Sequence, residues 1–452
     1  MADLTAQGRG NWSSKFGFIL AAAGSAVGLG NIWRFPTEVA QNGGAAFLLI
    51  YLLCCFIIGF PVMVAELSIG RKTRKNPVGA FKALSSNKIY PLIGFWGVIC
   101  GIMILSFYIV VAGWTLSFVF EEFFFFTGLE NWAAYFGDVS NGSKNALFSV
   151  LFMAITISII RGGVSEGIER ATKLMMPLLI GILVIMVIYV AFQPGAAAGF
   201  AAYLQPDLSK INTDLIFSAM GQAFFSLSLG MGALITYGSY LSQKENIPEA
   251  AAYVTLADVG IAFLAGLLIM PAMYLASHNG VAIFDESGEL LASADLIFQV
   301  LPALFHSLGS AAGIIFGVSF FLLLSVAALT STISLLEVPT SYIIDEFSIP
   351  RKKAATYIGG GILAISLFIS FNLGLIDLLD LIFSQVGLPL GGLLTCLFLG
   401  YVWKPEQAFE EIESGYMGLN TSFFKKTWPF FIRYIAPLAI LYNLFEALGI
   451  FG

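Results

Sequence analysis

Long apolar runs recur along the whole chain and are separated by short polar stretches. A helix that crosses the hydrocarbon core of a bilayer needs about 20 mostly apolar residues. Eleven runs meet this length, and they predict spanning helices near 15–38, 44–70, 90–125, 144–160, 170–193, 213–239, 250–276, 306–338, 354–371, 376–402 and 428–450. Because backbone groups in lipid must bond within their own segment, continuous apolar runs favour helices over barrel strands. The pattern therefore predicts an all-α integral membrane protein.

The composition agrees with a protein whose partner is the lipid bilayer. Hydrophobic residues make up 58% of the 452 residues. Charged residues make up only 11%, whereas soluble proteins contain about 25%. This composition excludes a disordered chain, a coiled coil and a basic nucleic-acid binder, and we expect neither a nucleic-acid nor a protein partner.

Few residues in the chain offer catalytic or metal chemistry. There are four cysteines, all inside apolar runs, and two histidines. No CxxC pair and no HExxH motif occurs, so we expect reduced, structural cysteines and no enzyme activity. The first fifteen residues are polar, and we therefore expect no cleavable signal peptide.

The basic residues predict how the chain lies in the membrane. With a cytoplasmic N-terminus, nineteen of the 22 Lys and Arg residues fall on the inner side, and only Lys144 and Lys210 fall outside. Cytoplasmic loops carry the excess of basic residues in membrane proteins. We therefore expect a cytoplasmic N-terminus, an extracellular C-terminus and a bacterial-type plasma membrane location.

The first and sixth predicted spans are unusual for membrane helices. The first contains Gly24-Ser-Ala-Val-Gly-Leu-Gly-Asn31, and the sixth contains Phe225-Ser-Leu-Ser-Leu-Gly-Met-Gly232. Glycine is about 1 kcal/mol less favourable than alanine in a helix, so both spans are predicted to be broken. Interrupted segments at matching places in two halves indicate a transport site. Close helix packing through Gly24-xxx-Gly28 is the alternative interpretation.

The spacing of the two broken spans predicts the domain organisation. They are five spans apart, and five is an odd number, so the two halves would have inverted topology. We expect a single transporter domain with repeats at residues 1–200 and 201–405. One extra C-terminal helix would then lie within residues 406–452.

Three motifs resemble the signature of the neurotransmitter:sodium symporter family. They are Gly24-Ser-Ala-Val-Gly-Leu-Gly-Asn-Ile-Trp-Arg-Phe-Pro36 with Gln41-Asn-Gly-Gly44, then Gln222-Ala-Phe-Phe-Ser-Leu-Ser-Leu-Gly230, and Ala328-Leu-Thr-Ser-Thr332. The resemblance covers nearly the whole chain. It implies sodium-coupled symport of neutral hydrophobic L-amino acids, aliphatic and aromatic, by alternating access. Many family members have twelve spans, whereas eleven are expected here.

The resemblance also implies which residues bind the substrate. They surround the two breaks and are Ala26, Leu29, Gly30, Ile104, Tyr108, Phe225, Ser226, Ser228, Met231, Ser331 and Leu335. The half-helix that begins at Leu29 and Gly30 would receive the substrate carboxylate at its positive end. The rest of the pocket is apolar, and the flexible Met231 would repack around large side chains.

Two sodium ions are implied, each held by oxygen atoms, which hard cations prefer. The first site would use Ala26, Asn31, Ser226 and Asp258, and the second Gly24, Val27, Ala327, Thr330 and Ser331. The substrate carboxylate would share the first ion, which couples the binding of ion and substrate. Helix back-bonding is the alternative role for the hydroxyls of the second site.

Asp258 leads us to expect no chloride requirement. It lies where family members carry an asparagine that ligates the first sodium. A carboxylate in mid-membrane is costly and usually functional, and Asp258 would replace the chloride ion that some relatives need. Gln222 and Tyr51 match the same anion region. A structural hydrogen-bonding role for Asp258 is the alternative.

The resemblance implies gates and supporting residues as well. The outer gate would be the pair Arg34 and Asp380 with Phe225 as a lid, and the inner gate Arg9 and Asp345 with Trp12 and Tyr240. Glu66 would support the broken sixth helix. Gly167 and Pro177 weaken the start of the fifth helix, where local unwinding would admit water to the second sodium.

Three other functions remain open from the sequence. The nearest is a proton-coupled amino acid transporter of the same fold. The others are a non-transporting amino acid receptor or channel, and a membrane enzyme, for which the sequence offers least support.

Overall fold

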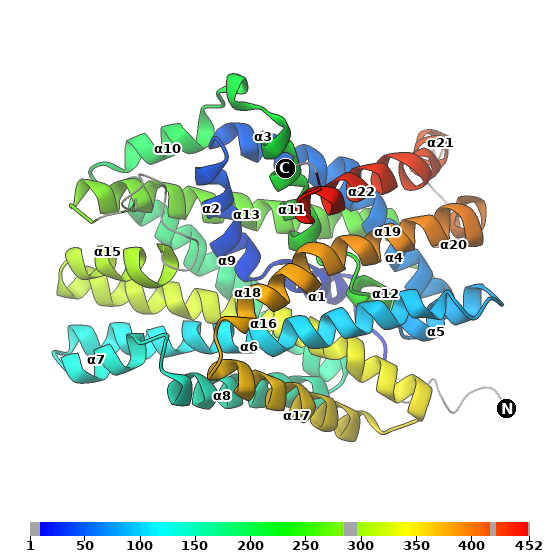
Figure 1. Cartoon of the computed structure of the whole chain (residues 1–452), viewed down its shortest axis with the longest axis horizontal. Helices are drawn as coiled ribbons and strands as arrows, with labels where there is room; N and C mark the ends of the chain where they lie inside the picture. The colour runs from blue at the N-terminus through cyan, green and yellow to red at the C-terminus, as the bar shows by residue number, and fades with distance from the viewer. Residues whose placement is uncertain (1–9, 282, 284–295, 416–421, 451–452) are drawn as a thin grey trace.

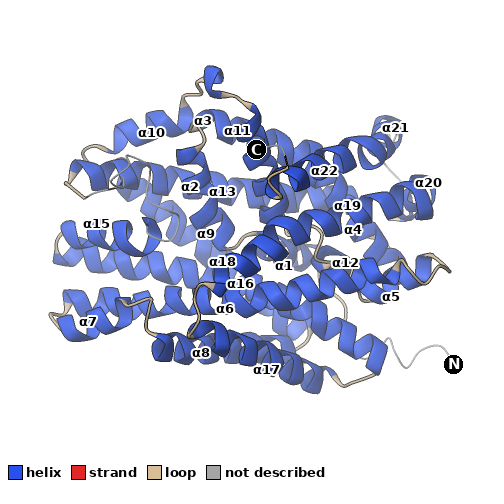
Figure 2. Cartoon of the chain, viewed as in Figure 1, coloured by secondary structure: helices blue, strands red, loops and turns tan. Residues whose placement is uncertain are grey.

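The computed structural model describes residues 10–281, 283, 296–415 and 422–450. Over these residues the chain forms helices joined by loops, and Figure 2 shows no strand among them. The all-helical class expected from the sequence is therefore confirmed. Arg9 lies outside the described residues.

The first half of the chain contains long helices and several short ones. In order they are α1 (Lys15–Ala26), η2 (Gly30–Arg34), α2 (Phe35–Gln41), α3 (Ala45–Cys54), η3 (Cys55–Gly59), α4 (Phe60–Thr73), α5 (Pro77–Leu84), α6 (Pro91–Phe126), α7 (Glu130–Gly137), α8 (Gly142–Arg161), η4 (Val164–Glu169), α9 (Arg170–Ala191), α10 (Ala196–Leu204) and η5 (Leu208–Lys210). The longest, α6, has 36 residues.

The second half repeats this mixture of long and short helices. In order they are α11 (Thr213–Ser226), α12 (Ala233–Gly238), α13 (Ile247–His278), η6 (Leu296–Val300), α15 (Leu301–Ser307), α16 (Ser310–Phe347), α17 (Arg351–Ser370), α18 (Leu375–Leu379), η7 (Asp380–Gly387), α19 (Leu388–Leu397), η8 (Phe398–Trp403), α20 (Pro405–Ser414), α21 (Ser422–Phe430), η9 (Phe431–Ile435) and α22 (Ala436–Ala447). Here α16 is longest, with 38 residues.

Among the described residues, nine helical segments are long and apolar enough to cross a membrane. The bent pair formed by α1 with η2 and α2 makes a tenth. The remaining expected span, near 213–239, consists of α11 and α12, which are separated by a break and are too short to be counted singly. The structure therefore supports nine or ten spans among the described residues, and the eleventh stays a prediction.

The span expected near 306–338 begins and ends later than the hydrophobic pattern suggested. Residues 301–307 form the separate helix α15, and Gly309 turns the chain with φ +84° before α16 begins. Apolar residues continue through this turn, so hydrophobicity alone did not reveal it. The helix α16 then runs on to Phe347.

Polar residues mark where several helices begin. The side chains of Ser14, Asn76, Asn141, Asn212 and Asn246 each accept a hydrogen bond from a backbone N–H in the first turn of α1, α5, α8, α11 and α13. Such N-caps satisfy donors that have no partner inside the helix. The loop residues therefore fix the starting points of the apolar helices.

Long helices such as α6, α13 and α16 run roughly along the longest axis of the molecule, as Figure 1 shows. The long helix α6 packs against α16, and α8 packs against α17. In the most apolar 18-residue stretch of α13, 72% of the residues are buried, whereas in that of η4 and α9 only 33% are buried. The helix α13 is thus central, while α9 presents apolar residues such as Leu174 and Ile185 at the surface.

A buried ion pair fastens the end of α4 to α20. Arg71 Nε lies 2.7 Å from Glu411 Oε1, and the side chains are 0% and 4% exposed. The guanidinium also donates to the backbone carbonyls of Glu245 and Glu411. Because each charge is compensated, the pair holds together α4, α20 and the loop between α12 and α13 that contains Glu245.

We expect Glu411→Ala to destabilise the protein strongly, because it leaves the Arg71 charge buried without a counterion. Breaking such a pair costs about 3–5 kcal/mol. The apparent melting temperature of the purified chain in detergent measures this effect. Glu410→Ala is the matched control, since Glu410 is exposed and should tolerate the change. Equal melting temperatures for the two variants would contradict the assigned role.

Candidate functional site

Both broken helices are interrupted where the sequence predicted. The chain is extended at Val27, with φ −74° and ψ 107°, and the helical parts on either side are bent by 56°. Between α11 and α12, positive φ values occur at Ser228, Gly230 and Gly232 (53°, 86° and 77°). Glycine adopts such values without steric cost, whereas serine rarely does. These backbone conformations end the helices and leave N–H and carbonyl groups free.

The two breaks contact each other. Ser228 Oγ donates a 2.9 Å hydrogen bond to the carbonyl of Ser25. Asn31 Nδ2 donates to Ser226 Oγ at 3.1 Å. The free polar groups of both helices therefore meet in the interior of the bundle.

A small cavity of about 40 Å³ lies at this junction. It is lined by all the expected substrate-binding residues except Leu29, namely Ala26, Gly30, Ile104, Tyr108, Phe225, Ser226, Ser228, Met231, Ser331 and Leu335. Leu29 contributes through its backbone, because its N–H donates to Tyr108 Oη at 3.1 Å. The structure thus brings together residues from four separate parts of the chain.

Two glycines are needed for this close approach. A Cβ at position 28 would lie 2.3 Å from Ser331 Oγ, and one at position 30 would lie 2.7 Å from Phe225 Cε1. Neither distance is compatible with a real side chain. Gly28 and Gly30 therefore let the broken helix approach the walls of the cavity.

Four further residues line the cavity but were not among the expected substrate-binding residues: Ser25, Gly28, Ser334 and Leu388. Ser334 lies one helical turn beyond Ser331 on α16, so helical spacing could have found it. Leu388 comes from α19, far along the chain, and no local pattern marks it.

The residues expected at the first ion site form one buried network. Asn31 Nδ2 donates to Asp258 Oδ1 at 2.7 Å, and Ser226 Oγ donates to Asp258 Oδ2 at 2.8 Å. Tyr51 Oη donates to Ser226 Oγ at 3.1 Å. Asn31 and Asp258 are both 0% exposed. A buried cluster of oxygen atoms that includes a carboxylate suits a hard cation, and Ala26 lines the adjoining cavity.

The residues of the second expected ion site converge between α1 and α16. Thr330 Oγ1 donates to the carbonyl of Val27 at 3.1 Å and to that of Ala327 at 2.8 Å. A Cβ at Gly24 would lie 3.4 Å from Thr330 Cβ. Ser331, the fifth expected ligand, instead lines the cavity at the breaks. The hydroxyl of Thr330 thus links the break that follows α1 to the continuous helix α16.

A larger cavity of about 420 Å³ lies on the other side of Phe225, which lines both. Arg34 lies 5.0 Å from the centroid of the Phe225 ring. Arg34 and Asp380 both line this second cavity, but the ion pair expected between them is not formed in this structure. Arg34 instead lies 3.5 Å from Glu38, and Asp380 accepts a 3.0 Å hydrogen bond from Gln385.

The expected inner gate residues lie at the opposite end of the bundle. Trp12 Nε1 donates to a carbonyl of α12 at 3.1 Å, and its ring meets that of Tyr240 edge-on at 6.1 Å. Asp345 accepts hydrogen bonds from the backbone and side chain of Asn76 and lines a third cavity of about 830 Å³. The expected pairing of Asp345 with Arg9 stays a prediction, because Arg9 lies outside the described residues.

Two polar clusters near this inner end were not foreseen. Tyr240 Oη donates to Glu337 Oε1 at 2.6 Å, and Glu337 pairs with Arg351. Glu169 accepts hydrogen bonds from the backbone N–H and hydroxyl of Ser13, at 2.7 and 2.6 Å. These contacts join segments distant in the sequence, and helical periodicity gives no signal for them.

Two supporting residues lie beside the breaks. Glu66 Oε1 accepts a 2.7 Å hydrogen bond from the free N–H of Gly230, and Glu66 is fully buried. Gln222 Nε2 donates to the carbonyl of Gly30 at 3.3 Å. Glu66 of α4 thus supports the break between α11 and α12, and Gln222 of α11 supports the break that follows α1.

The segment formed by η4 and the start of α9, where unwinding was expected, is helical in this structure. Gly167 lies in the wide helical turn η4, and Pro177 lies inside α9. A Cβ at Gly167 would lie 2.1 Å from the carbonyl of Ile159. Met176, next to Pro177, approaches Gly24 of the second ion site, with its Sδ 3.4 Å from a Cβ built there. The expected unwinding stays a prediction.

Comparison with known proteins decides the family. Residues 9–135 and 124–449 match the profile of the sodium:neurotransmitter symporter family. The chain belongs to this family. It is a membrane transporter of a sodium-coupled class and is not an enzyme.

Two of the relatives described next cover nearly the whole length of the chain. The uncharacterized sodium-dependent transporter YhdH of Bacillus subtilis is 33% identical, over 97% of this chain and 98% of its own. The human sodium- and chloride-dependent GABA transporter 2 is 28% identical over 63% of this chain and 54% of its own. The crystal structure of MhsT in complex with L-phenylalanine is 40% identical, with a TM-score of 0.85 over 97% of this chain and 100% of MhsT.

We expect Glu66→Ala to destabilise the protein and Glu66→Gln to be tolerated. Alanine leaves the buried N–H of Gly230 without an acceptor, which costs about 1–3 kcal/mol, whereas glutamine retains a carbonyl oxygen. Thermal unfolding in detergent measures the difference. If both variants melted at the same temperature, the hydrogen bond to the break would not matter for stability.

Proposed function

We propose that the protein is a sodium-coupled symporter that imports neutral hydrophobic L-amino acids, both aliphatic and aromatic, by alternating access. Two sodium ions would accompany each substrate, and chloride would not be required. The observation that carries this proposal is the junction of the two breaks, where an oxygen-rich network adjoins an apolar cavity. The solved relative with bound L-phenylalanine supports the substrate class.

The cavity has the two kinds of surface that a hydrophobic amino acid needs. Its polar end has Tyr108 and the N-terminus of the broken helix at Gly30, which would bind the substrate carboxylate. Its apolar wall consists of side chains such as Ile104, Met231 and Leu335. None of the described lining residues is charged, so the cavity offers no partner for an acidic or basic substrate side chain.

Asp258 supports both sodium coupling and chloride independence. A buried carboxylate is unfavourable unless it is compensated. The side chains that contact it are those of Asn31, Ser226 and Tyr51, which are neutral. A sodium ion would supply the positive charge, and the carboxylate would supply the negative charge that chloride provides in a chloride-dependent relative.

The expected sodium gradient is strong enough to concentrate the substrate. A tenfold gradient is worth about 1.4 kcal/mol per ion, and 100 mV adds about 2.3 kcal/mol per charge. Two ions with a neutral amino acid therefore supply roughly 7 kcal/mol, a concentrating power on the order of 10⁵.

We further infer eleven membrane crossings with a cytoplasmic N-terminus in a bacterial-type plasma membrane. The broken pairs α1 with α2, and α11 with α12, would each count as one crossing. Two inverted repeats of five helices would then be followed by a last crossing that ends with α22. The distribution of Lys and Arg supports this orientation.

A proton-coupled transporter of the same fold is the second candidate. It is favoured by a single observation, the buried Asp258, which could carry a proton in place of an adjacent ion. Uptake into proteoliposomes separates the two functions. We expect labelled leucine and phenylalanine to accumulate under an inward sodium gradient with gluconate replacing chloride. Accumulation driven by an acid pulse without sodium would favour the proton-coupled alternative.

We expect Asp258→Asn to make uptake depend on chloride, because the site loses its fixed negative charge. Without chloride, uptake should fall at least about tenfold, which corresponds to 1.4 kcal/mol, and added chloride should restore it. Uptake by the unaltered protein in the same two buffers is the control. A variant that is equally active in both buffers would refute the proposed role of the carboxylate.

We expect Thr330→Val to weaken sodium activation and Thr330→Ser to preserve most of it. Valine has nearly the shape of threonine but lacks the hydroxyl that faces Val27 and Ala327. The sodium concentration for half-maximal uptake should rise at least about tenfold, a loss of 1.4 kcal/mol. Identical sodium curves for the two variants would place the second ion elsewhere.

A further inference from the structure

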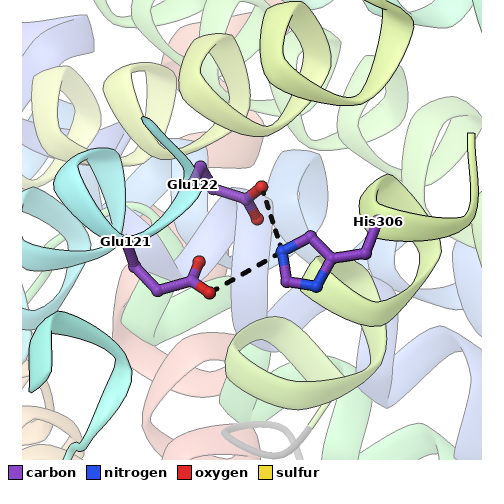
Figure 3. Close-up of side chains that lie close together, drawn as sticks. All are labelled: Glu121, Glu122 and His306. Atoms are coloured by element: carbon purple, nitrogen blue, oxygen red, sulfur yellow. Dashed lines mark ion pairs between the residues drawn. The ribbon is translucent and has the colours of Figure 1, made fainter. Parts of the chain in front are cut away.

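Three side chains that take no part in the proposed transport site converge at the C-terminal end of α6. Glu121 and Glu122 belong to α6, and His306 belongs to α15. Figure 3 shows both carboxylates directed at the same imidazole. Helices far apart in the sequence therefore present one nitrogen and two carboxylate ligands to a common point.

The polar atoms of this cluster lack ordinary partners. Glu122 is 0% exposed, and neither of its carboxylate oxygens has a hydrogen-bond partner among the described residues. His306 Nε2 is also buried without such a partner. The nearby Lys144 donates instead to the carbonyl of Phe136 at 2.7 Å. Buried polar atoms are normally satisfied, and among the described residues the only approaches to these atoms are the ion pairs of His306 Nε2 with Glu121 and Glu122. A bound ligand would satisfy them.

The two spacings from the imidazole to the carboxylates match those around a tetrahedral metal ion. Zinc bonds of about 2.0–2.2 Å place two tetrahedral ligands about 3.3–3.6 Å apart. His306 Nε2 lies 3.6 Å from Glu121 Oε1 and 3.5 Å from Glu122 Oε2. One atom from each of the three groups lies within 4.8 Å of the others. A single ion could thus contact all three and keep a fourth position for water.

The surroundings hold the ligands in place. The ring of Phe125 stacks on that of His306, with centroids 3.4 Å apart. A Cβ at Gly317 of α16 would lie 2.3 Å from Glu122 Oε2, so a larger residue at this position would displace the carboxylate.

We propose that Glu121, Glu122 and His306 form a binding site for Zn²⁺ or a similar divalent transition metal. One imidazole and two carboxylates, with an open fourth position, is a ligand set that zinc accepts. The bound ion would tie α15 to the end of α6. It would also compensate two buried carboxylates, which a proton shared with the imidazole could do only in part.

Zinc binding to the purified full-length chain tests the proposal. The protein should carry no histidine tag, and titration against a chromophoric zinc chelator would give stoichiometry and affinity. We expect one ion per chain. Removing a ligand in His306→Gln or Glu122→Gln should weaken binding by at least about tenfold. His278→Gln is the matched control, because His278 is the only other histidine and is exposed at the end of α13.

Zinc-edge X-ray absorption provides a second test that does not depend on the ligand variants folding. In the His278→Gln protein, His306 is the sole histidine, so imidazole scattering around the ion would place the metal at this site. Sulfur ligation would assign the ion to cysteines and overturn the proposal. Unchanged affinity in folded His306→Gln, or no stoichiometric binding by the unaltered chain, would overturn it as well.

Discussion

Unwound backbone inside a membrane protein is the constraint on which the rest of this structure depends. Lipid and dry protein supply no water, so each free N–H and carbonyl must find a partner within the fold. Here Glu66 accepts from Gly230, Gln222 donates to the carbonyl of Gly30, and Ser228 donates to that of Ser25. The breaks persist because neighbouring side chains replace the lost helical hydrogen bonds.

The same constraint creates the binding chemistry. A broken helix exposes the positive end of one half and the carbonyls of the other, at a depth where charges interact strongly. Ordinary membrane helices offer neither group. The polar atoms at the junction are therefore the direct consequence of Gly28, Gly30, Gly230 and Gly232, which permit close approach or positive φ.

The sequence was informative where function needs unusual residues in apolar surroundings. Glycines, Asn31 and Asp258 interrupt hydrophobic runs, so their pattern and a family resemblance located most of the cavity. Contacts between distant segments carried no such signal. The partners of Glu337 and the cavity position of Leu388 depend on how helices pack, and packing is not encoded in the periodicity of either helix.

Side-chain pairing was also less predictable than residue position. Arg34 and Asp380 line the same cavity, as expected, yet each has another partner. Exposed ion pairs are worth at most about 1 kcal/mol, so the energy difference between the expected pair and the observed partners is small. The buried Arg71 and Glu411 pair has no such freedom, because separation would leave two charges without solvent.

The two hydrogen-bonded networks proposed to hold sodium differ in the helices that they join, and this difference bears on the proposed coupling. Asn31 links the outer part of the broken helix to Asp258 on α13, whereas the carbonyl of Val27 links its extended segment to Thr330 on α16. Both α13 and α16 are long, continuous helices, while the parts of the broken helix are short. Ions at these places would therefore determine how a short, hinged element is held against a rigid frame. Ion binding at each site would then favour one position of the broken first helix over another, and such a shift in conformation is what a coupled transporter requires.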